Sequence, residues 1–413
     1  MEEENWVWLT GGSTAAGSTR SAAKDIPIFP SSLSVATVRD RVALLLATKE
    51  TGRTVTLDHI LEKVGRDVSF LEHRDVGADE VKEALDSLIG QGAASTVKDG
   101  YLRLPRIDEI VSEVVTKAGS ELNRSYMLVW IAKKYYPRVA DQMLPFLTGR
   151  PISAVKIFSG KKNPIEELST IFVRYARRKP KPVNLTVDTK ERLLTLVDDH
   201  CVDFIPYVHK IGSNEPDIFV LDMDAGSALL KHRKAFGFIK FVTAHLAEML
   251  SEKGVQPMVK FSGSRGFQVW AFLDNSKMPA NRDLFALYRD MAVSVQSRLE
   301  ERLQERSGEV EDKFHEIMKA GRPFTTSIVA HKEERASKIL VDWSSMKPAG
   351  DVRAPFSIHY RTGLVSLPLT LNEIEGFEMG DAEPFKVAEH IEKYRGAAEI
   401  RLSDPSALLG FLE

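Results

Sequence analysis

The chain has 413 residues, of which 43% are hydrophobic and 28% charged, and its formal net charge is −2 at pH 7. This length exceeds a single ordinary core, so we expect two or three domains, and the composition excludes a disordered protein. The hydrophobic runs stay short of the roughly 18 to 20 residues that cross a bilayer, so no membrane partner is expected. Cys201 is the only cysteine, which excludes an intrachain disulfide and a cysteine-based zinc site. Together with the acidic start Met-Glu-Glu-Glu, this predicts a cytoplasmic protein.

Residues 1–34 are rich in glycine, serine, threonine and alanine, which predicts a flexible leader. From 35 to 105, hydrophobic periodicity predicts helices over 38–47, from about 54 to 64 and over 79–90, and then a hairpin turning on Asp99-Gly100. This order resembles a winged helix-turn-helix domain whose recognition helix is 79–90. That helix has one base among four acids, which disfavours contact with phosphates, so DNA binding and protein docking both stay open. Its charged residues are Asp79, Glu80, Lys82, Glu83 and Asp86.

Residues 106–413 are predicted to form the second domain. Its first part, 106–147, has a helical pattern, and strands and helices alternate from about 150 onward, which indicates an α+β or α/β domain of roughly 250 residues. The predicted elements are strands over 152–158 and 217–222, a strand pair within 255–272, and helices over 190–197, 231–253 and 282–304. The highly charged segment 302–313 is expected to be a solvated connection.

The segment Ile218-Phe-Val-Leu-Asp222-Met-Asp224 is the sharpest local feature. Its apolar run predicts a buried strand, and residues two apart on a strand share a face, so Asp222 and Asp224 point the same way. Two adjacent carboxylates repel each other unless a cation lies between them or one is protonated. The alternative is an ordinary acidic turn at the end of a strand.

A glycine-rich turn lies between two apolar strands, in the segment Val259-Lys260-Phe-Ser262-Gly-Ser264-Arg265-Gly266-Phe-Gln268. Glycines let backbone N–H groups converge on an anion, while the hydroxyl of Ser262 and the guanidinium of Arg265 add donors suited to phosphate. The alternative is a hairpin with a glycine-rich tip. Beyond this turn, Lys338-Ile-Leu-Val-Asp342 is another apolar strand that ends in an acid. Three acids and basic donors are what metal-assisted phosphoryl transfer requires.

In this order and spacing the motifs resemble the archaeo-eukaryotic primase superfamily. Its members have an Asp-x-Asp after an apolar strand, a Ser-Gly-x-x-Gly-x-His turn, and a later apolar strand ending in Asp. The narrower likeness is to the polymerase domain of bacterial DNA ligase D and its archaeal relatives, through the Gly149-Arg150-Pro151 turn and the segments 204–209 and 354–357. The segment 357–363 is similar to a stretch of archaeal primase small subunits. The resemblance covers about 125–370 and implies an α+β, RRM-like primase-polymerase core beside the N-terminal winged-helix domain.

The resemblance implies roles for particular residues. Asp222, Asp224 and Asp342 would bind Mg²⁺ or Mn²⁺ as the catalytic carboxylates, which requires Asp342 to lie within about 10 Å of the other two. The remaining candidates would bind nucleotide or phosphate: His209, Lys260, Ser262, Gly263, Ser264, Arg265, Gly266, Gln268, Ser357, His359 and Arg361. For His209 the alternative is a half-buried core histidine, and for Arg361 a surface arginine.

Two departures from the family pattern bear on catalysis. The histidine of the second motif is Gln268 here, which donates hydrogen bonds but carries no positive charge. The arginine that commonly follows the third acid in the ligase-linked domains is also absent, because Asp342-Trp-Ser-Ser stands in its place. Neither departure removes a metal ligand.

The resemblance therefore predicts a metal-dependent, template-directed DNA primase or polymerase that makes or extends primers, or fills gaps, in replication or in break repair by end joining. Expected partners are a DNA template and primer, nucleoside triphosphates, and a separate ligase or primase large-subunit-like protein. The alternative is a catalytically decayed DNA-binding or assembly subunit of a replication or repair complex. A transcription regulator accounts only for the winged-helix segment and leaves three strand-end acids unexplained.

Overall fold

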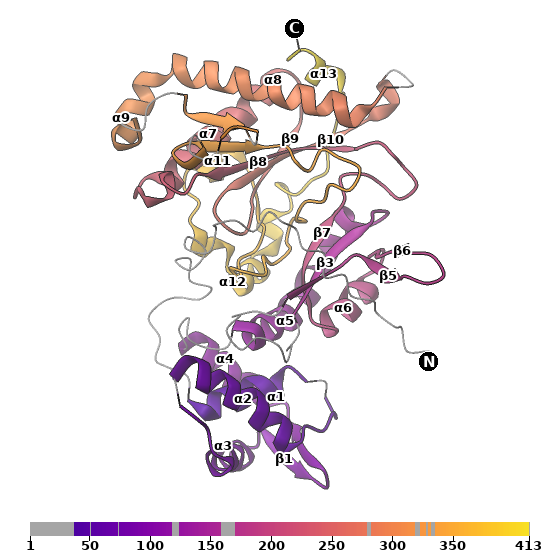
Figure 1. Cartoon of the computed structure of the whole chain (residues 1–413), viewed down its shortest axis with the longest axis vertical. Helices are drawn as coiled ribbons and strands as arrows, with labels where there is room; N and C mark the ends of the chain where they lie inside the picture. The colour runs from indigo at the N-terminus through magenta and orange to yellow at the C-terminus, as the bar shows by residue number, and fades with distance from the viewer. Residues whose placement is uncertain are drawn as a thin grey trace.

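The computed structural model describes residues 37–49, 51–72, 74–117, 124–157, 170–278, 282–318, 323–327, 329–331 and 335–412. The predicted leader, 1–34, lies outside these residues, as does Phe158 at the predicted end of a strand. The α+β class is confirmed by helices and sheets that follow one another along the chain (Figure 1). Among the described helices, none has both the length and the hydrophobicity that a membrane span requires.

The N-terminal unit has the predicted order of three helices and a hairpin. The helices are α1 (Val38–Ala47), α2 (Leu57–Glu72) and α3 (Ala78–Gly90), and the hairpin pairs β1 (Ala94–Val97) with β2 (Gly100–Arg103). Because Val97 pairs with Gly100, the turn residues are Lys98 and Asp99, one position before the predicted turn. A backbone bridge from Val55 to Tyr101 adds a third extended segment. This order agrees with a winged helix, and that assignment stays a prediction.

Two further helices lead to a small sheet. The helices are α4 (Ile107–Lys117) and α5 (Arg124–Leu147), as predicted for 106–147, and α6 (Lys190–Asp198) packs against α5. The sheet has the order β4 (Thr170–Val173), β3 (Ile152–Ile157), β7 (Cys201–Pro206), and β5 (Tyr175–Arg177) forms a separate pair with β6 (Val183–Asn184). Since α5 contacts α1, β3 and β7, it joins the N-terminal unit to this sheet (Figure 1).

The larger sheet has the strand order β11-β12-β8-β10-β9-β13, with β14 paired to β10. Its strands are β8 (Ile218–Ala225), β9 (Pro257–Phe261), β10 (Phe267–Leu273), β11 (Thr325–Ser327), β12 (Ile339–Asp342), β13 (Pro368–Leu369) and β14 (Leu402–Ser403). The pairs β11–β12 and β10–β14 are parallel, and the other pairs are antiparallel. The adjacency of β12 and β8 matters most for function, because both strands end in candidate catalytic acids.

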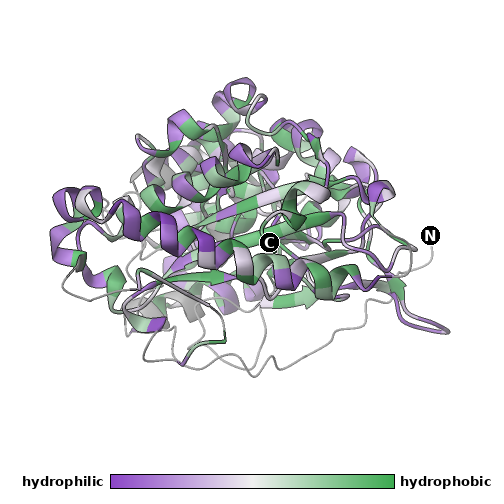
Figure 2. Cartoon of the chain, turned by 90° about the horizontal axis from the view of Figure 1, so that it is seen from above, coloured by the Kyte–Doolittle hydropathy of each residue, from purple (hydrophilic) through white to green (hydrophobic). Residues whose placement is uncertain are grey.

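Helices cover one face of this sheet. They are α7 (Ala235–Glu252) and α8 (Leu284–Glu305), with α9 (Ser307–Met318) following α8. Phe236 of α7 stacks on Phe267 at 5.7 Å between ring centroids, and Phe219 of β8 meets Tyr288 of α8 at 6.3 Å. Because side chains alternate along a strand, the neighbours of these residues point to the opposite face. In Figure 2 the strands are mainly hydrophobic, whereas the helices carry both hydrophilic and hydrophobic turns.

The predicted connection over 302–313 is wrong, since this segment belongs to α8 and α9. Its charges support a helix because Glu309 pairs with Arg306 at 3.5 Å and with Lys313 at 3.1 Å, three and four residues away. The C-terminal part of the chain forms short helices around the sheet. They are α11 (Leu371–Ile374), α12 (Pro384–Glu389) and α13 (Ser406–Leu409), and the chain also has the 3-10 helices η2 (Leu229–Lys231), η3 (Asn275–Lys277), η4 (Met379–Ala382) and η5 (Ile391–Tyr394).

Candidate active site

One row of polar residues crosses the larger sheet on the face opposite α7 and α8. In this row Asp342 of β12 pairs with Asp222 of β8, Asp222 with Gln268 of β10, and Gln268 with Lys260 of β9. Directly opposite residues of an antiparallel pair have Cα atoms roughly 4.5 to 5.5 Å apart and side chains on the same face. The register therefore brings Asp342 beside Asp222, and Asp224 lies two positions further along β8 on that face.

The two acids of β8 are half-buried and repel each other. Burial, followed by the charges of Asp224 and Asp342, raises the pKa of Asp222 from 3.8 to about 7. Burial also raises the pKa of Asp224, although the nearby Arg265 guanidinium opposes this. Gln268 Nε2 donates to Asp222 Oδ2 at 2.8 Å, whereas Asp222 Oδ1 is buried without a hydrogen-bond partner in the part of the chain that the structure describes. A buried carboxylate oxygen without a donor favours the arrival of a cation.

The chemistry of this site fits a hard divalent cation. Three carboxylates and no sulfur or imidazole ligand beside them are what Mg²⁺ or Mn²⁺ prefers. Within the described ranges, however, no three His, Cys, Asp or Glu side chains are grouped as a metal site. Asp342 Oδ1 instead accepts the backbone N–H of Ser344 at 2.6 Å. Metal binding would therefore require side-chain rotation on a backbone that already brings the acids together.

A cavity of about 290 Å³ opens in front of Asp222 and Asp342. It runs between the larger sheet and β7, and both acidic and basic side chains line it. Lys347 and Arg353 bring positive charge to the wall that faces the acids. The full lining is Ile205, Asp222, Gln268, Asp342, Ser344, Ser345, Lys347, Gly350, Asp351, Val352 and Arg353. Carboxylates and cations that line one cavity suit a polyphosphate bound through a metal.

The glycine-rich turn closes around Ser262. Its hydroxyl oxygen accepts the backbone N–H groups of Ser264 at 3.3 Å and Gly266 at 3.4 Å, so the turn is held by its own side chain. Gly263 has a φ of +85°, in the left-handed region that favours glycine. A Cβ on Gly266 would lie 1.9 Å from the carbonyl oxygen of Met223, so only glycine fits there. The turn is thus packed directly against the strand that carries the two acids.

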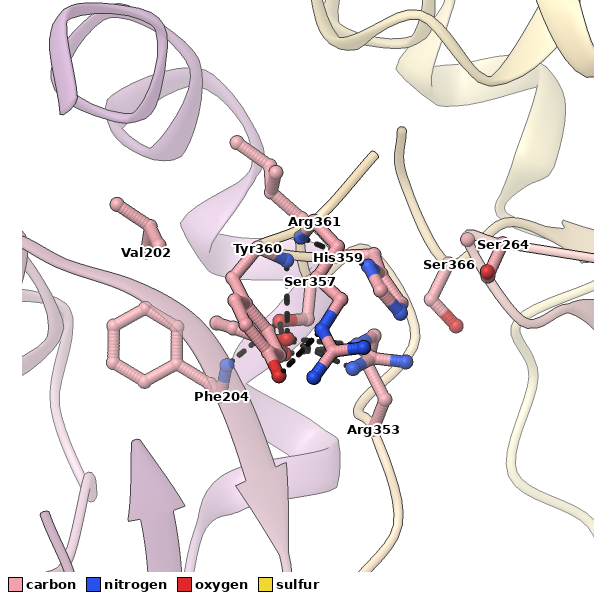
Figure 3. A network of polar contacts seen from close by, with 12 residues as sticks. Val202, Phe204, Ser264, Arg353, Ser357, His359, Tyr360, Arg361 and Ser366 are labelled. Carbon is pink, nitrogen blue, oxygen red and sulfur yellow. Dashed lines mark hydrogen bonds and ion pairs between the residues drawn. The ribbon is translucent and has the colours of Figure 1, made fainter. Parts of the chain in front are cut away.

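The segment 357–363 lies beside this turn, because Thr362 donates its hydroxyl to the carbonyl of Gly263. The ring of His359 stacks on that of Tyr360 at 5.5 Å, and Arg361 Nε donates to the Tyr360 hydroxyl at 2.9 Å. Burial and the charges of Arg353 and Arg361 lower the pKa of His359 well below its usual range. Figure 3 shows His359, Tyr360 and Arg361 gathered around Arg353. The segment therefore brings an imidazole and an exposed guanidinium next to the glycine-rich turn.

Of the predicted nucleotide and phosphate ligands, only Gln268 lines the cavity, and three of the others are held by contacts elsewhere. Lys260 is fully buried, donates to Ser366 Oγ at 2.6 Å and lies over the ring of Trp270. Ser357 is also fully buried, and its hydroxyl donates to Asp203.

The ring of His209 is also held by contacts within the protein. Its two ring nitrogens lie 2.9 Å and 2.8 Å from the carbonyl oxygens of Lys210 and Pro348. It therefore lies behind the segment that contributes Lys347 and Gly350 to the cavity. Direct contact of any of these three residues with a nucleotide stays a prediction that this geometry does not favour.

Sequence reasoning missed a buried ion pair at the centre of the site. Arg353 Nη2 donates to Asp203 Oδ2 at 2.8 Å, its Nε donates to Asp203 Oδ1 at 2.9 Å, and its Nη1 donates to the carbonyl of Ser262 at 3.2 Å. Asp203 also accepts the Tyr360 backbone N–H at 3.3 Å. The pair joins β7, the glycine-rich turn and the segment 357–361, and Figure 3 shows Arg353 close to Ser357 and Tyr360 of that segment. The sequence places Arg353 between two motifs, which was the one signal that it belongs to the site. Its partner Asp203 lies 150 residues away along the chain, so no local pattern indicates the pair.

With this geometry in view, the chain can be compared with known proteins. Residues 132–311 match the family model described as "LigD, primase-polymerase domain". A solved structure entitled "Polymerase Domain from Mycobacterium tuberculosis Ligase D in complex with DNA" is similar at 18% identity and a TM-score of 0.42, covering 64% of this chain and 91% of that one. Among curated proteins, none matches the chain.

The family model covers less than half of this chain, and within residues 132–311 the chain resembles primase-polymerase domains. This resemblance agrees with the one seen in the sequence motifs, to the LigD primase-polymerase domain within the archaeo-eukaryotic primases. The matched segment contains Asp222, Asp224 and the glycine-rich turn, and it ends before Asp342. Roles for Asp342 and for the segment 357–363 therefore depend on geometry and on the sequence motifs.

Proposed function

We propose that this chain is a metal-dependent, template-directed nucleotidyltransferase that makes or extends primers on DNA. The observation that carries the proposal is the cross-strand pairing of Asp342 with Asp222, which joins two sequence motifs 120 positions apart at one cavity. Expected partners are a template–primer DNA and nucleoside triphosphates, and any strand joining would fall to a separate ligase. Replication and break repair are both compatible with this chemistry.

In this proposal the acids and the basic groups have separate tasks. Asp222, Asp224 and Asp342 would hold Mg²⁺ or Mn²⁺, and the bound ion would supply charge stabilisation for the attacking 3′ hydroxyl and the leaving pyrophosphate. Arg265 and Arg361 would bind the triphosphate, since both extend from the adjoining segments 262–266 and 357–363. Backbone N–H groups of the glycine-rich turn would add donors that need no rearrangement.

Gln268 replaces the family histidine, and its position indicates a different task. Its Nε2 donates to Asp222 Oδ2, and its Oε1 accepts from Trp270 Nε1 at 3.3 Å. Gln268 would therefore orient Asp222 as a metal ligand through this hydrogen bond, in place of a charged contact with phosphate. The same contact favours the second candidate function, a decayed subunit, because the amide stabilises Asp222 in the absence of a metal.

A primer-extension assay separates the two functions. The purified chain is incubated with Mn²⁺, a labelled template–primer and either ribo- or deoxynucleotides, beside Asp342→Ala and the control Asp312→Ala on the exposed side of α9. We expect extension by the wild type and the control, and a loss of more than about a hundredfold for Asp342→Ala, since a metal contributes several kcal/mol to the transition state. A wild type that binds DNA and nucleotides but extends no primer would overturn the proposal.

A further inference from the structure

The predicted recognition helix, α3, presents acids to solvent. Asp79, Glu83 and Asp86 are exposed, and the Asp79 side chain is 95% exposed. Its one lysine, Lys82, lies 3.7 Å from Asp79, and Arg74 before the helix pairs with Glu80 at 2.9 Å. Since phosphates are repelled by such a surface, α3 is a poor candidate for binding a nucleic-acid backbone.

The bases of the same unit lie instead where it meets α5. Lys49 follows α1, Arg53 lies in the exposed segment before α2, and Lys63 lies on α2 with its side chain only 8% exposed. Lys49 Nζ is 3.4 Å from His59 Nε2, so two basic groups are in direct contact. On the opposite side of this junction, Lys133 of α5 donates to the carbonyl of Thr48 at 3.1 Å.

The core adds further basic groups at this junction. Lys156 lies near the end of β3, and His200 lies in the turn between α6 and β7. Burial, then the charges of Lys133, Lys49, Lys156 and Arg53, lowers the pKa of His200 to about 4, which shows that these groups lie close together. We call this set of residues the basic seam: Lys49, Arg53, His59, Lys63, Lys133, Lys156 and His200.

The acids at the seam do not balance it. Three lysines of the seam have an acidic partner. Lys63 pairs with Glu62 at 3.4 Å, Lys133 with Asp198 at 3.7 Å, and Lys156 with Asp199 at 2.5 Å. Asp198 is 60% exposed while Lys133 is 14% exposed, so the cations are recessed and the acids lie at the rim.

Two cations of the seam are in excess of these pairs. Among the described residues, no carboxylate lies within ion-pair distance of Lys49 or Arg53. After burial, the nearby charges of Arg53, Lys63 and Lys133 lower the pKa of Lys49 further. Two cations without an ion-pair partner among the described residues, one half-buried and one exposed, attract an anion.

One strand connects the seam with the candidate active site. His200 precedes β7, and Ile205 near the other end of β7 lines the cavity. Five residues of extended chain span about 16 Å, which equals about five base pairs of duplex at roughly 3.4 Å each. A duplex whose primer terminus lies at Asp222 and Asp342 would have backbone phosphates at this distance. In Figure 1 the N-terminal helices, α5 and α6, and the sheet with β7 follow one another along the long axis of the molecule.

We propose that the basic seam binds the sugar–phosphate backbone of the template–primer about five base pairs from the site of nucleotidyl transfer, so that the N-terminal unit holds DNA through its junction with the core and not through α3. This inference rests on the proposed function for the position of the primer terminus. The contacts are with phosphates, so binding at the seam is independent of base sequence.

Fluorescence anisotropy with the full chain tests the seam separately from catalysis. The probe is a labelled template–primer duplex, used in two unrelated sequences, in EDTA and without nucleotides, over a series of salt concentrations. The seam variant is Lys49→Ala/Arg53→Ala, and the control Arg74→Ala/Lys82→Ala removes the same charge beside and on α3. We expect the slope of log affinity against log salt to fall by about 1.8 for the seam variant and to stay unchanged for the control.

Equal slopes for the two variants, or a wild type that binds neither duplex, would overturn the inference. Thermal unfolding checks that both variants fold, and Arg53→Ala alone, an exposed position, serves if the double variant does not. Failure of the proposed function alone would give a different result. In that case the wild type would extend no primer, but the seam variant would still bind DNA more weakly than the wild type.

Discussion

Replacing Asp222 with asparagine separates the stability of the fold from its chemistry. In the fold the pKa of Asp222 is about 7, raised by burial and by Asp224 and Asp342, whereas the ordinary value is 3.8. The folded protein therefore holds this proton more tightly than the unfolded chain does, and stability falls as pH rises from about 4 to 7. At about pH 8 the ionised group destabilises the fold by up to ~4 kcal/mol, and below about pH 4 the effect is small.

Asparagine removes this charge and can still accept the hydrogen bond from Gln268. In EDTA at about pH 8 we expect Asp222→Asn to be more stable than the wild type by about 2 to 4 kcal/mol, measured by chemical denaturation, and the difference to shrink toward about pH 4. Saturating Mn²⁺ should offset most of this difference, because a ligand at a hundredfold its Kd stabilises the wild type by about 2.7 kcal/mol. Asp312→Asn on α9 is the control, with a change within about 0.5 kcal/mol. If Asp222→Asn is less stable than the wild type in EDTA at both pH values, the three acids do not repel one another as described.

Three further substitutions test other parts of the account. Gly266→Ala brings a Cβ 1.9 Å from a carbonyl oxygen of β8 and should lower the free energy of unfolding by about 3 kcal/mol or more. The control Gly308→Ala, where the added Cβ meets open space, should not lower it. Similar melting temperatures for both variants would contradict this close contact. Asp203→Ala leaves the Arg353 guanidinium buried without its carboxylate and should lower the free energy of unfolding by about 3 to 5 kcal/mol, measured by chemical denaturation. The double variant Asp203→Ala/Arg353→Met should recover part of that stability. No recovery would mean that the broken ion pair is not the cause of the loss. His200 has a pKa of about 4 in the fold, so the unfolded chain takes up this proton first as pH falls from 6.5, and the fold loses stability. His200→Asn, in which asparagine tolerates the φ of +66°, should therefore raise the free energy of unfolding by about 2 kcal/mol at about pH 5 and leave it unchanged at about pH 8. An equal change at both pH values would refute this.

Local sequence patterns predicted the parts of the fold that depend on local forces. The apolar run before Asp222 and the glycines between β9 and β10 gave the strand and the turn, because burial and backbone freedom are properties of a few adjacent residues. The helices from 38 to 147 followed from hydrophobic periodicity in the same way. The segment 302–313 was misjudged, because its charges pair with one another at helical spacing and do not only interact with solvent.

Contacts between distant segments were beyond the reach of sequence patterns. Lys260 has the residue type of a phosphate ligand, yet the fold buries it beneath Trp270 and satisfies it with Ser366. The Asp203–Arg353 pair depends on β7 lying next to a segment that follows β12, which no local pattern specifies. The apolar strand ending in Asp342 and the family resemblance proposed it as a partner of Asp222, and the register of β12 against β8 gives that proposal its geometry.

The central claim is that three carboxylates share a divalent cation, and direct Mn²⁺ binding tests it without relying on turnover. The measurement is a titration of the full chain with Mn²⁺, followed by calorimetry or by the loss of the free-ion paramagnetic resonance signal, for the wild type, Asp342→Asn and Asp222→Asn/Asp224→Asn/Asp342→Asn. The account predicts saturable binding by the wild type, at least about tenfold weaker binding after the single substitution, and none by the triple variant. Equal Mn²⁺ affinity in the wild type and the triple variant would contradict it.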